Sequence, residues 1–198
     1  MKKYDTMIFD LDGTLAVSKQ PLDDQMASLL SDATKNINVV VITGGTFEQI
    51  KKQVIDRLAP DAHFENLFIL PTTGSAMQKF NINTDDWEVV YELEFTDDQK
   101  NRVMSALEKG LDNASFTIDQ SILKGEQIED RHSQITFSAL GQEQLPDVKK
   151  AWDPDYSKRK ELVALLADLN AEFSVKFGGS TSIDITLAGI DKAFGINE

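Results

Sequence analysis

Apolar runs and amphipathic stretches alternate through the first 70 residues of the chain. The runs at 39–42 and 67–70 are short and continuously apolar, and the stretch 4–9 ends in the apolar residues Met7, Ile8 and Phe9. Such runs are typical of buried parallel strands. The two stretches between them space their apolar residues as one face of a helix does: Met26, Leu29, Leu30 and Ala33 in the first, and Ile50, Val54 and Leu58 in the second. This order of strands and helices predicts an α/β fold with a doubly wound parallel sheet.

The middle of the chain follows a different pattern. Thr96 and Gln99 have the spacing of a capping box before a helix. Further elements are expected as strands at 87–95, 115–118, 126–131, 134–140, 173–177 and 182–187, a proline-containing loop at 146–154 and a leucine-striped helix from Ser157. The acidic excess of the chain is also concentrated here. We therefore expect a core formed by residues 1–80 and 186–198, interrupted by an inserted α+β cap domain at 81–185.

The composition narrows the class of protein. With 198 residues, 41% of them hydrophobic, the chain can form one large domain or two modest ones. The absence of cysteine excludes disulfides and thiolate metal sites, and the presence of only two histidines argues against zinc. A net charge of -13 disfavours nucleic acid as a partner. No apolar run approaches the length of a membrane span, and the first residues lack the apolar core of a signal peptide, so we expect a cytoplasmic protein.

Two carboxylates follow the first apolar run. Asp10 and Asp12 would emerge at the carboxyl end of that strand, just before Gly13, and open α/β sheets hold their ligands at this edge. One carboxylate can attack phosphorus there, while the second protonates the leaving oxygen and later activates water. Mg²⁺ bound between carboxylate and phosphate would offset the repulsion between the two anions. The pattern therefore suits phosphoryl transfer.

Two simpler interpretations compete with this one. A bare Asp-x-Asp in an acidic chain is usually a solvated turn. An EF-hand calcium loop also begins with Asp-x-Asp, but it needs glycine at its sixth position and glutamate at its twelfth. In this chain the glycine is Gly13, at the fourth position, and the twelfth position is Pro21. The calcium interpretation is therefore excluded.

The tract hydrophobic-Phe-Asp-x-Asp-Gly-Thr-Leu resembles the nucleophile motif of the haloacid dehalogenase (HAD) superfamily of phosphatases and phosphomutases. The resemblance implies a HAD-like Rossmannoid core. It also implies that Asp10 is the nucleophile and a Mg²⁺ ligand, and that Asp12 is the general acid and base, with its backbone carbonyl as a second metal ligand. Members that cleave carbon-halogen or carbon-phosphorus bonds generally lack the second acid, so its presence favours phosphate esters.

The same resemblance points to three further core residues. Thr43 ends the second predicted strand, where HAD proteins carry a Ser or Thr that bonds the phosphoryl group, and Gly44 follows it in a loop whose N–H groups can approach an anion. A threonine at this place is equally common as a plain turn residue, and Thr46, the alternative, is explained by a capping box. Lys192 matches the family lysine that neutralises the nucleophile and the phosphate, although an isolated lysine is usually solvated.

Two tracts of the middle region resemble the cap of eukaryotic-type phosphomannomutases and their prokaryotic HAD relatives. They are 129–141, EDRHSQITFSALG, and 178–185, GGSTSIDI. The resemblance implies substrate contacts by Arg131 in the first tract, by Ser182 and Asp184 in the second, and by Lys19 beyond the nucleophile motif. Simpler interpretations remain open, since Arg131 could form a surface ion pair with Asp130 and Asp184 could face water.

The chain also departs from the mutase pattern. Two phosphate-binding arginines of the mutases fall on Gln142 and Lys149, and the Asn of an Asn-Gly pair after the third predicted strand is replaced by Thr73. An arginine grips phosphate with two parallel hydrogen bonds, whereas lysine supplies a point charge and glutamine no charge. A mutase must hold a bisphosphorylated intermediate in two orientations, so these losses favour hydrolysis.

We therefore expect a Mg²⁺-dependent phosphatase that acts on a small phosphorylated metabolite, preferably a sugar phosphate, through an aspartyl-phosphate at Asp10. A phosphomannomutase is the alternative, and a catalytically inactive fragment or binding module is the second alternative. The acidic motif Gly-Asp-x-x-x-x-Gly-x-Asp that follows the lysine in HAD cores does not occur in this sequence. This absence predicts a truncated enzyme with weak Mg²⁺ binding, little activity and a sheet edge that a homodimer would shield.

Overall fold

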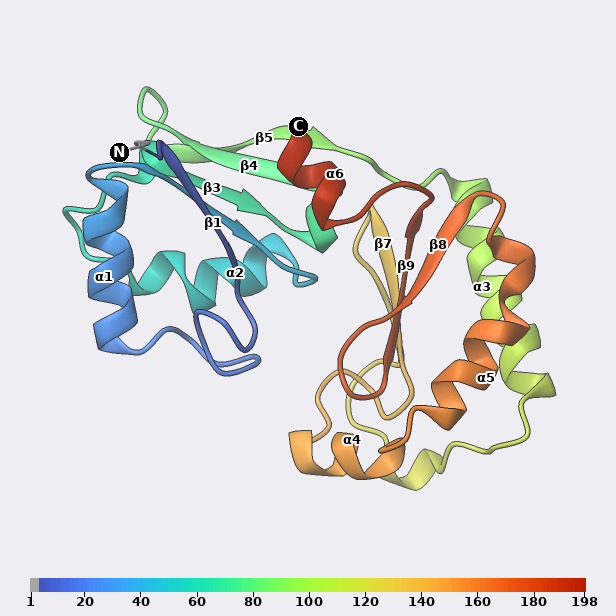
Figure 1. Cartoon of the computed structure of the whole chain (residues 1–198). Helices are drawn as coiled ribbons and strands as arrows, with labels where there is room; N and C mark the ends of the chain where they lie inside the picture. Colours follow the sequence, from blue (N-terminus) through green and yellow to red (C-terminus); the bar gives the residue numbers. More distant parts are fainter. Residues whose placement is uncertain (1–3) are drawn as a thin grey trace. The chain divides into compact units, whose positions relative to one another are not determined.

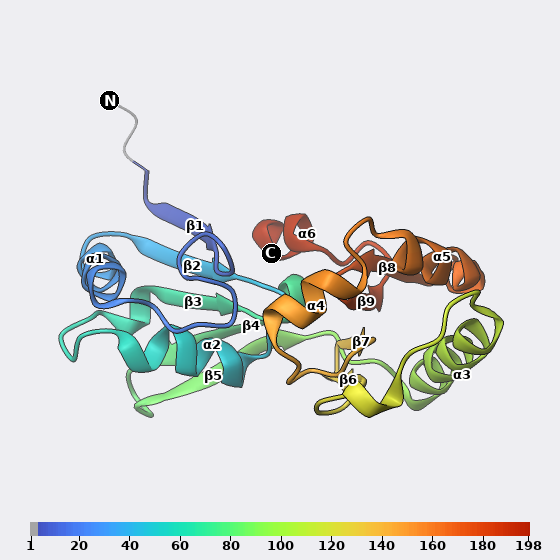
Figure 2. The same cartoon turned by 90° about the horizontal axis from the view of Figure 1, so that it is seen from below.

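The computed structural model describes residues 4–198, which form two compact units. The first unit contains the chain up to Leu93 together with Ile190–Glu198, and the second contains Glu94–Gly189. Figures 1 and 2 show the chain in two orientations, coloured along the sequence.

The first unit is organised around a five-stranded sheet with the order β1-β2-β3-β4-β5 (Figure 1). Its strands are β1 (Thr6–Asp10), β2 (Asn38–Ile42), β3 (Leu67–Leu70), β4 (Ala76–Asn81) and β5 (Asp86–Glu92). The first three strands run parallel, whereas β4 and β5 are antiparallel to their neighbours. Asp10 lies opposite Ile42, and Ile42 opposite Leu70. The three carboxyl ends therefore meet at one edge, and the predicted α/β class with a parallel sheet is confirmed.

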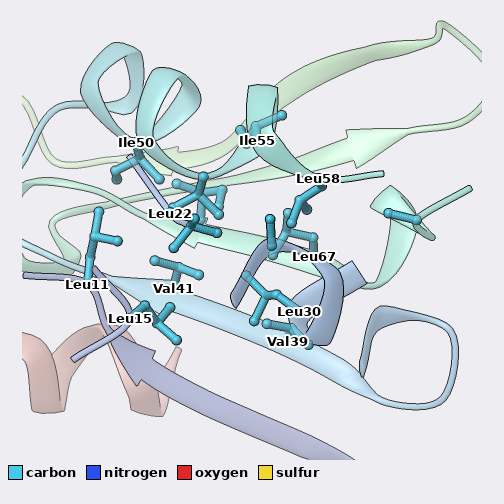
Figure 3. Close-up of a cluster of buried hydrophobic side chains, with 14 residues drawn as sticks. Leu11, Leu15, Leu22, Leu30, Val39, Val41, Ile50, Ile55, Leu58 and Leu67 are labelled. Carbon is cyan, nitrogen blue, oxygen red and sulfur yellow. The ribbon is translucent and has the colours of Figure 1, made fainter. Parts of the chain in front are cut away.

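Helices cover both faces of the parallel strands. Helices α1 (Asp24–Thr34) and α2 (Phe47–Gln53) lie on one face, where Leu30 and Ile50 join the buried cluster drawn in Figure 3. The other members of that cluster on the sheet are Val39, Val41, Leu67 and Ile69. Because side chains alternate along a strand, Leu70 points to the opposite face, where it packs against α6 (Lys192–Asn197). Short 3-10 turns complete the unit at Ile55–Arg57, Phe64–Asn66 and Thr72–Gly74.

The second unit is a four-stranded antiparallel sheet with helices on one face. Its order is β6-β7-β9-β8, with β6 (Ile128–Asp130), β7 (Gln134–Ser138), β8 (Phe173–Phe177) and β9 (Ser182–Leu187). The helices are α3 (Asp97–Asn113), α4 (Pro146–Trp152) and α5 (Ser157–Leu165), with 3-10 turns at Gln120–Ile122 and Ala167–Leu169. Ile135, Phe137 and Ile185 are buried together with Leu107 of α3 and Leu162 of α5. Strands and helices in this arrangement form the predicted α+β module.

The boundaries between the units differ from those expected. The predicted core ended at residue 80 and resumed at 186, whereas the first unit extends to Leu93 and resumes at Ile190. The reason is the β4-β5 hairpin. The stretch 87–95 was expected in the cap, but β5 pairs with β4 over its length and extends the first sheet (Figure 1). Alternating polarity predicted a strand here correctly, but it carries no information about which sheet the strand joins.

Two local predictions in the second unit are wrong. No strand forms at 115–118, where the N–H and hydroxyl of Ser115 donate to the Glu161 carboxylate at 2.6 and 2.7 Å instead of joining a ladder. The predicted loop at 146–154 contains α4, which begins at Pro146. Proline is favoured in the first turn of a helix, where its missing N–H has no intrahelical partner to lose.

Strand β1 lies at the edge of the sheet that residues 4–198 form. Met7 and Ile8 are 47% and 41% exposed there, and an edge strand of this kind can pair with another chain. The expected homodimer stays a prediction. Among the described helices, none is long and apolar enough to cross a membrane.

Candidate functional site

The predicted nucleophile lies where the parallel strands end. Asp10 is the last residue of β1, and its Oδ1 accepts hydrogen bonds from the Leu11 N–H at 2.9 Å and from the Lys192 ammonium at 2.7 Å. Both side chains of this ion pair are less than half exposed. Lys192 begins α6, which Asp191 caps by accepting from the N–H groups of Ala193 and Phe194. The fold thus brings Asp10 and Lys192 together although they lie at opposite ends of the chain.

The second predicted acid organises the loop after β1. Asp12 is exposed, and its Oδ1 accepts from the backbone N–H of Lys19 at 2.7 Å. The loop turns at Gly13, whose φ of 78° favours glycine, and returns to Asp12 through a bridge with Ala16. Lys19 also has a positive φ, 62°. The Lys19 backbone therefore lies beside the predicted acid, and the expected contact of its side chain with substrate stays a prediction.

Thr43 and Gly44 begin the loop after β2, beside Asp10. Asp10 and Ile42 are paired, so Thr43 is the next residue beyond the edge at which Asp10 ends. The Thr43 N–H donates to the Leu70 carbonyl at 3.1 Å, and Thr43 is buried whereas Gly44 is partly exposed. Thr46 forms the predicted capping box with Gln49, so its hydroxyl is engaged at the start of α2. Thr43 and Gly44 remain the candidates for contact with a phosphoryl group.

Sequence reasoning gave little weight to the turn after β3. The Thr73 N–H donates to the Thr43 carbonyl at 2.8 Å, and the Thr72 N–H donates to the Gly45 carbonyl at 2.9 Å. Thr72, Thr73 and Gly74 all have positive φ. The departure from the Asn-Gly pattern at Thr73 was the available signal, because asparagine adopts this conformation more readily than threonine. The turn borders the candidate site through the loop that starts at Thr43.

In the second unit, the predicted substrate residues lie on the sheet face opposite the helices. Glu129, Thr136, Asp184 and Lys176 form one cross-strand row, and the buried apolar side chains of the same strands point the other way. Arg131 directly follows the last residue of β6. Its guanidinium forms an ion pair with the Glu129 carboxylate at 2.6 Å, and only 8% of its side chain is exposed. The suggested surface pair with Asp130 is wrong, since Asp130 pairs with Lys100 instead.

Asp184 is largely withdrawn from water. Its Oδ1 accepts a hydrogen bond from the Thr136 hydroxyl at 2.9 Å. Gly178 approaches the carboxylate so closely that a Cβ at this position would lie 2.6 Å from Asp184 Oδ2, which explains why glycine occurs there. Burial raises the pKa of Asp184, although the Thr136 hydroxyl and the Arg131 charge act in the opposite direction. Ser182 begins the same strand and is partly buried, opposite Ser138.

Asp184→Asn is expected to stabilise the protein increasingly as the pH rises. A raised carboxyl pKa means that the folded state disfavours the charged form, so wild-type stability falls as the pH rises through and above the ordinary value of 3.8. Asparagine keeps an acceptor for Thr136 and carries no charge. Urea unfolding between about pH 3 and pH 7 should show the difference in unfolding free energy growing in favour of the variant. The exposed Asp168→Asn is the control, and a difference that shrinks with pH would contradict the prediction.

The two positions where mutases carry arginines lie together. The Lys149 ammonium donates to the Gln142 backbone carbonyl at 3.0 Å, and Lys149 is only 7% exposed. A lysine that is buried and bonded to a carbonyl presents little charge to solvent.

The oxygen donors near β1 fit a magnesium ion only in part. The Asp10 carboxylate and the Asp12 carbonyl are ligands of the kind that Mg²⁺ prefers, and Mg²⁺ commonly uses one or two carboxylates together with substrate phosphate and water. Within residues 4–198, no group of three His, Cys, Asp or Glu side chains is arranged to hold a metal. Asp191, the acid nearest to Lys192 in sequence, uses its carboxylate to cap α6. Asp10 and Asp12 are thus the candidates for a site with few protein ligands.

Fold and site together define a class of protein. An open α/β sheet presents a carboxylate, a neighbouring acid and a lysine at the carboxyl edge of its parallel strands, an arrangement suited to phosphoryl transfer. The chain belongs to the haloacid dehalogenase-like hydrolase family, whose model matches residues 7–198. This family and the relatives below indicate a phosphohydrolase or phosphomutase.

Similar curated proteins include several phosphomannomutases. A probable phosphomannomutase of Caenorhabditis elegans is 24% identical over 195 residues, which cover 95% of this chain and 74% of that protein. A phosphomannomutase of Triticum aestivum is 27% identical over 199 residues, which cover 94% of this chain and 73% of that protein.

Solved structures with a similar fold include a nucleotidase and a sugar-phosphate phosphatase. A Plasmodium falciparum IMP-nucleotidase matches 97% of this chain with a TM-score of 0.65 and 20% identity. The C-terminal domain of a C. albicans trehalose-6-phosphate phosphatase matches 96% with a TM-score of 0.61 and 15% identity. This chain covers 54% and 59% of those two chains. At these identities the likeness establishes the fold alone.

Proposed function

We propose that this protein transfers the phosphoryl group of a small phosphorylated metabolite to water through an aspartyl-phosphate on Asp10. The observation that carries the proposal is the 2.7 Å ion pair between Asp10 and Lys192 at the carboxyl end of β1. A lysine here offsets the negative charge that accumulates when a phosphate dianion approaches a carboxylate. The loop that begins at Thr43 lies beside the pair and supplies backbone N–H groups near the same edge.

The two carboxylates take different parts in the reaction. Asp10 Oδ2 attacks phosphorus, because both hydrogen bonds described above go to Oδ1. Asp12 gives its proton to the leaving oxygen as the ester bond breaks, and it then removes a proton from the water that attacks the phosphoryl group. Inorganic phosphate leaves, and the Asp10 carboxylate is regenerated. Mg²⁺, when bound by the Asp10 carboxylate and the Asp12 carbonyl, supplies additional positive charge at the phosphoryl group.

Water is the proposed acceptor rather than a second sugar hydroxyl. The relatives are phosphomannomutases, which makes a mutase the second candidate. The bonding of Lys149 to the Gln142 carbonyl supports hydrolysis, because a mutase has to grip a second phosphate on its cap. A mutase requires an activating sugar bisphosphate, whereas a phosphatase turns over without it. Phosphate release that does not depend on added bisphosphate is the expected result.

A sugar phosphate is the proposed substrate class. The polar sheet face of the second unit offers hydroxyls, a carboxylate and the Arg131–Glu129 pair, which suit the hydroxyl-rich part of a sugar. Among the structural neighbours, one acts on trehalose-6-phosphate by its name and another on IMP. Screening a panel of sugar phosphates, nucleotides and other phosphorylated metabolites for phosphate release tests the proposal. Absence of release from every compound, with Mg²⁺ present, would favour an inactive fragment or binding module.

Arg131→Ala is expected to weaken sugar-phosphate turnover selectively. A charge-assisted hydrogen bond contributes about 1.5 to 3 kcal/mol, so KM should rise by roughly 10- to 150-fold for a sugar phosphate. A small aryl phosphate, which lacks the sugar that Arg131 is proposed to contact, should be affected much less. Arg102→Ala is the matched control, because Arg102 forms an ion pair with Glu172 in the same unit. Equal losses for both substrates would mean that Arg131 acts through the Glu129 pair alone, as a structural residue.

Magnesium binding is expected to be weak, with half-saturation at about millimolar concentration or above. The reason is the small set of acidic groups at the candidate site, since Mg²⁺ is held weakly where the protein supplies few carboxylates. Isothermal titration with MgCl₂, with and without inorganic phosphate, measures this directly. Micromolar affinity without phosphate would contradict the prediction and would require a further ligand group.

A further inference from the structure

The turn after β3 adopts a strained left-handed conformation. Three successive residues, Thr72, Thr73 and Gly74, have φ of 48°, 63° and 88°. Glycine tolerates this region, but a β-branched residue such as threonine rarely adopts it. Such strain persists only where the surrounding structure holds it, and it is concentrated at functional sites. The hydrogen bonds and packing contacts that hold this turn are therefore evidence for its role in the protein.

Two sets of hydrogen bonds fix the turn. The first set joins the turn to the loop after β2: the N–H groups of Thr72 and Thr73 donate to the carbonyls of Gly45 and Thr43, at 2.9 and 2.8 Å. The second set joins the turn to β5, where the Tyr91 hydroxyl donates to the Gly74 carbonyl at 2.9 Å. The Ser75 hydroxyl also bonds Thr72 at 2.7 Å. The turn is therefore anchored to β5 and to the loop that carries Thr43 and Gly44.

The same turn is the surface on which α6 rests. A Cβ built on Gly195 would lie 2.8 Å from the Gly74 Cα, and one built on Gly74 would lie 3.1 Å from the Gly195 Cα. The first distance is shorter than real Cβ contacts, so a side chain at Gly195 would force a shift, whereas the second is only a tight contact. At Gly74 the positive φ of 88° also favours glycine. Phe194 adds an edge-on ring contact with Tyr91. Lys192 lies one turn before Gly195 in this six-residue helix.

We propose that the turn at 71–75 is a positioning element, which sets Lys192 and the Thr43–Gly45 loop at the correct distance from Asp10, with the Gly74–Gly195 contact as its joint. The inference rests on the proposed function of Asp10 and Lys192, and it adds residues that do not touch the substrate. The Lys192 ammonium reaches Asp10 from the first turn of a helix whose Gly195 backbone packs against Gly74. A side chain at Gly195 would lift α6 and lengthen the Lys192–Asp10 distance.

Gly195→Ala tests the Gly74–Gly195 contact, because alanine should stabilise the helix itself while its side chain disturbs the contact. Alanine is the better helix former, so the substitution would leave α6 at least as helical if the contact with Gly74 were unimportant. We expect kcat to fall by about 10-fold or more, with KM changing much less. In a Lys192→Ala background the same substitution should change kcat by less than about 2-fold, because coupling vanishes when the partner is absent.

Two further variants separate positioning from general damage. Tyr91→Phe removes only the hydroxyl that bonds the Gly74 carbonyl, keeps the ring contact with Phe194, and should fold even if Gly195→Ala does not. A smaller loss of kcat is expected, again abolished by Lys192→Ala. Ile196→Ala, on the exposed side of the same helix, is the control and should retain wild-type kcat. Full losses that persist in the Lys192→Ala background, or no loss in Gly195→Ala and Tyr91→Phe, would overturn the inference.

A second measurement does not depend on turnover. Acetylation of lysines with an activated ester, followed by mass spectrometry, reports how freely each amine reacts. We expect Lys192 in Gly195→Ala to react several-fold faster than in the wild type, with the exposed Lys52 as internal reference, because the ion pair with Asp10 is loosened. If the wild type releases no phosphate from any substrate, the proposed function fails, and the labelling still decides the positioning role. Unchanged labelling in a folded Gly195→Ala variant would refute it.

Discussion

Asp10→Asn is expected to abolish phosphate release. The amide that replaces the carboxylate is not a competent nucleophile, and it is not an anionic ligand for Mg²⁺. It can still accept the Leu11 N–H that Asp10 Oδ1 accepts at 2.9 Å, so the end of β1 should keep its conformation. The ion pair with Lys192 is lost. Turnover should therefore fall to background while the protein stays folded.

The experiment compares three proteins with the best substrate from the panel. Asp5→Asn is the matched control, because Asp5 is an exposed aspartate just before the same strand and its substitution changes the net charge equally. Acid quenching with labelled substrate, followed by peptide mapping, should place phosphate on Asp10 in the wild type and in Asp5→Asn. Turnover by Asp10→Asn at wild-type rate would remove the proposed mechanism.

The second large effect is expected for Asp12→Asn, which should slow turnover by about 10²- to 10⁴-fold, the usual contribution of general acid and base catalysis. Asp12 Oδ1 accepts the Lys19 N–H at 2.7 Å, and the asparagine oxygen can accept the same hydrogen bond. The loop between Asp12 and Lys19 should therefore remain in place. The loss of turnover in Asp12→Asn then measures the contribution of proton transfer, because the structure of the loop is unchanged.

The leaving group provides the decisive comparison for Asp12→Asn. An aryl phosphate with an acidic phenol needs little help from a general acid, so formation of the aspartyl-phosphate should be slowed much less than with an alkyl phosphate. Its hydrolysis still needs a base, so a burst of phenol release should precede slow turnover. Equal slowing of both substrates without a burst would show that Asp12 supports the loop and does not transfer protons.

Local sequence patterns were sufficient for most elements of the fold. The capping boxes at Thr46 and Thr96 formed as predicted, because their hydrogen bonds span only three residues. The apolar runs became β1, β2 and β3, and β2 and β3 are largely buried as predicted. The expected burial of the first run is wrong, because β1 forms the edge of the described sheet and exposes Met7 and Ile8. The nucleophile motif likewise sits where the strand pattern put it, at the end of β1.

The sequence patterns gave a wrong prediction where the structure of a segment depended on which distant residues it pairs with. Residues 87–95 had the alternation of a strand, but only pairing with β4 assigned β5 to the first sheet. Residues 115–118 had the composition of a strand, but Ser115 bonds Glu161, which is 46 residues away. Hydrophobic periodicity measures which side of a segment is buried, and it does not measure what the segment is buried against.

By itself, the sequence determined the class of fold, and it predicted the nucleophile motif and the residues that could serve it. Tertiary structure alone decided how they are held. Asp10 and Lys192 are separated by 182 positions and meet in the folded protein, where α6 packs against the turn after β3. That arrangement brings together two glycines from distant segments, Gly74 and Gly195, and a left-handed pair of threonines. A contact between distant backbones leaves no periodic trace in the sequence, because it depends on the final packing of the elements and not on the propensity of either one.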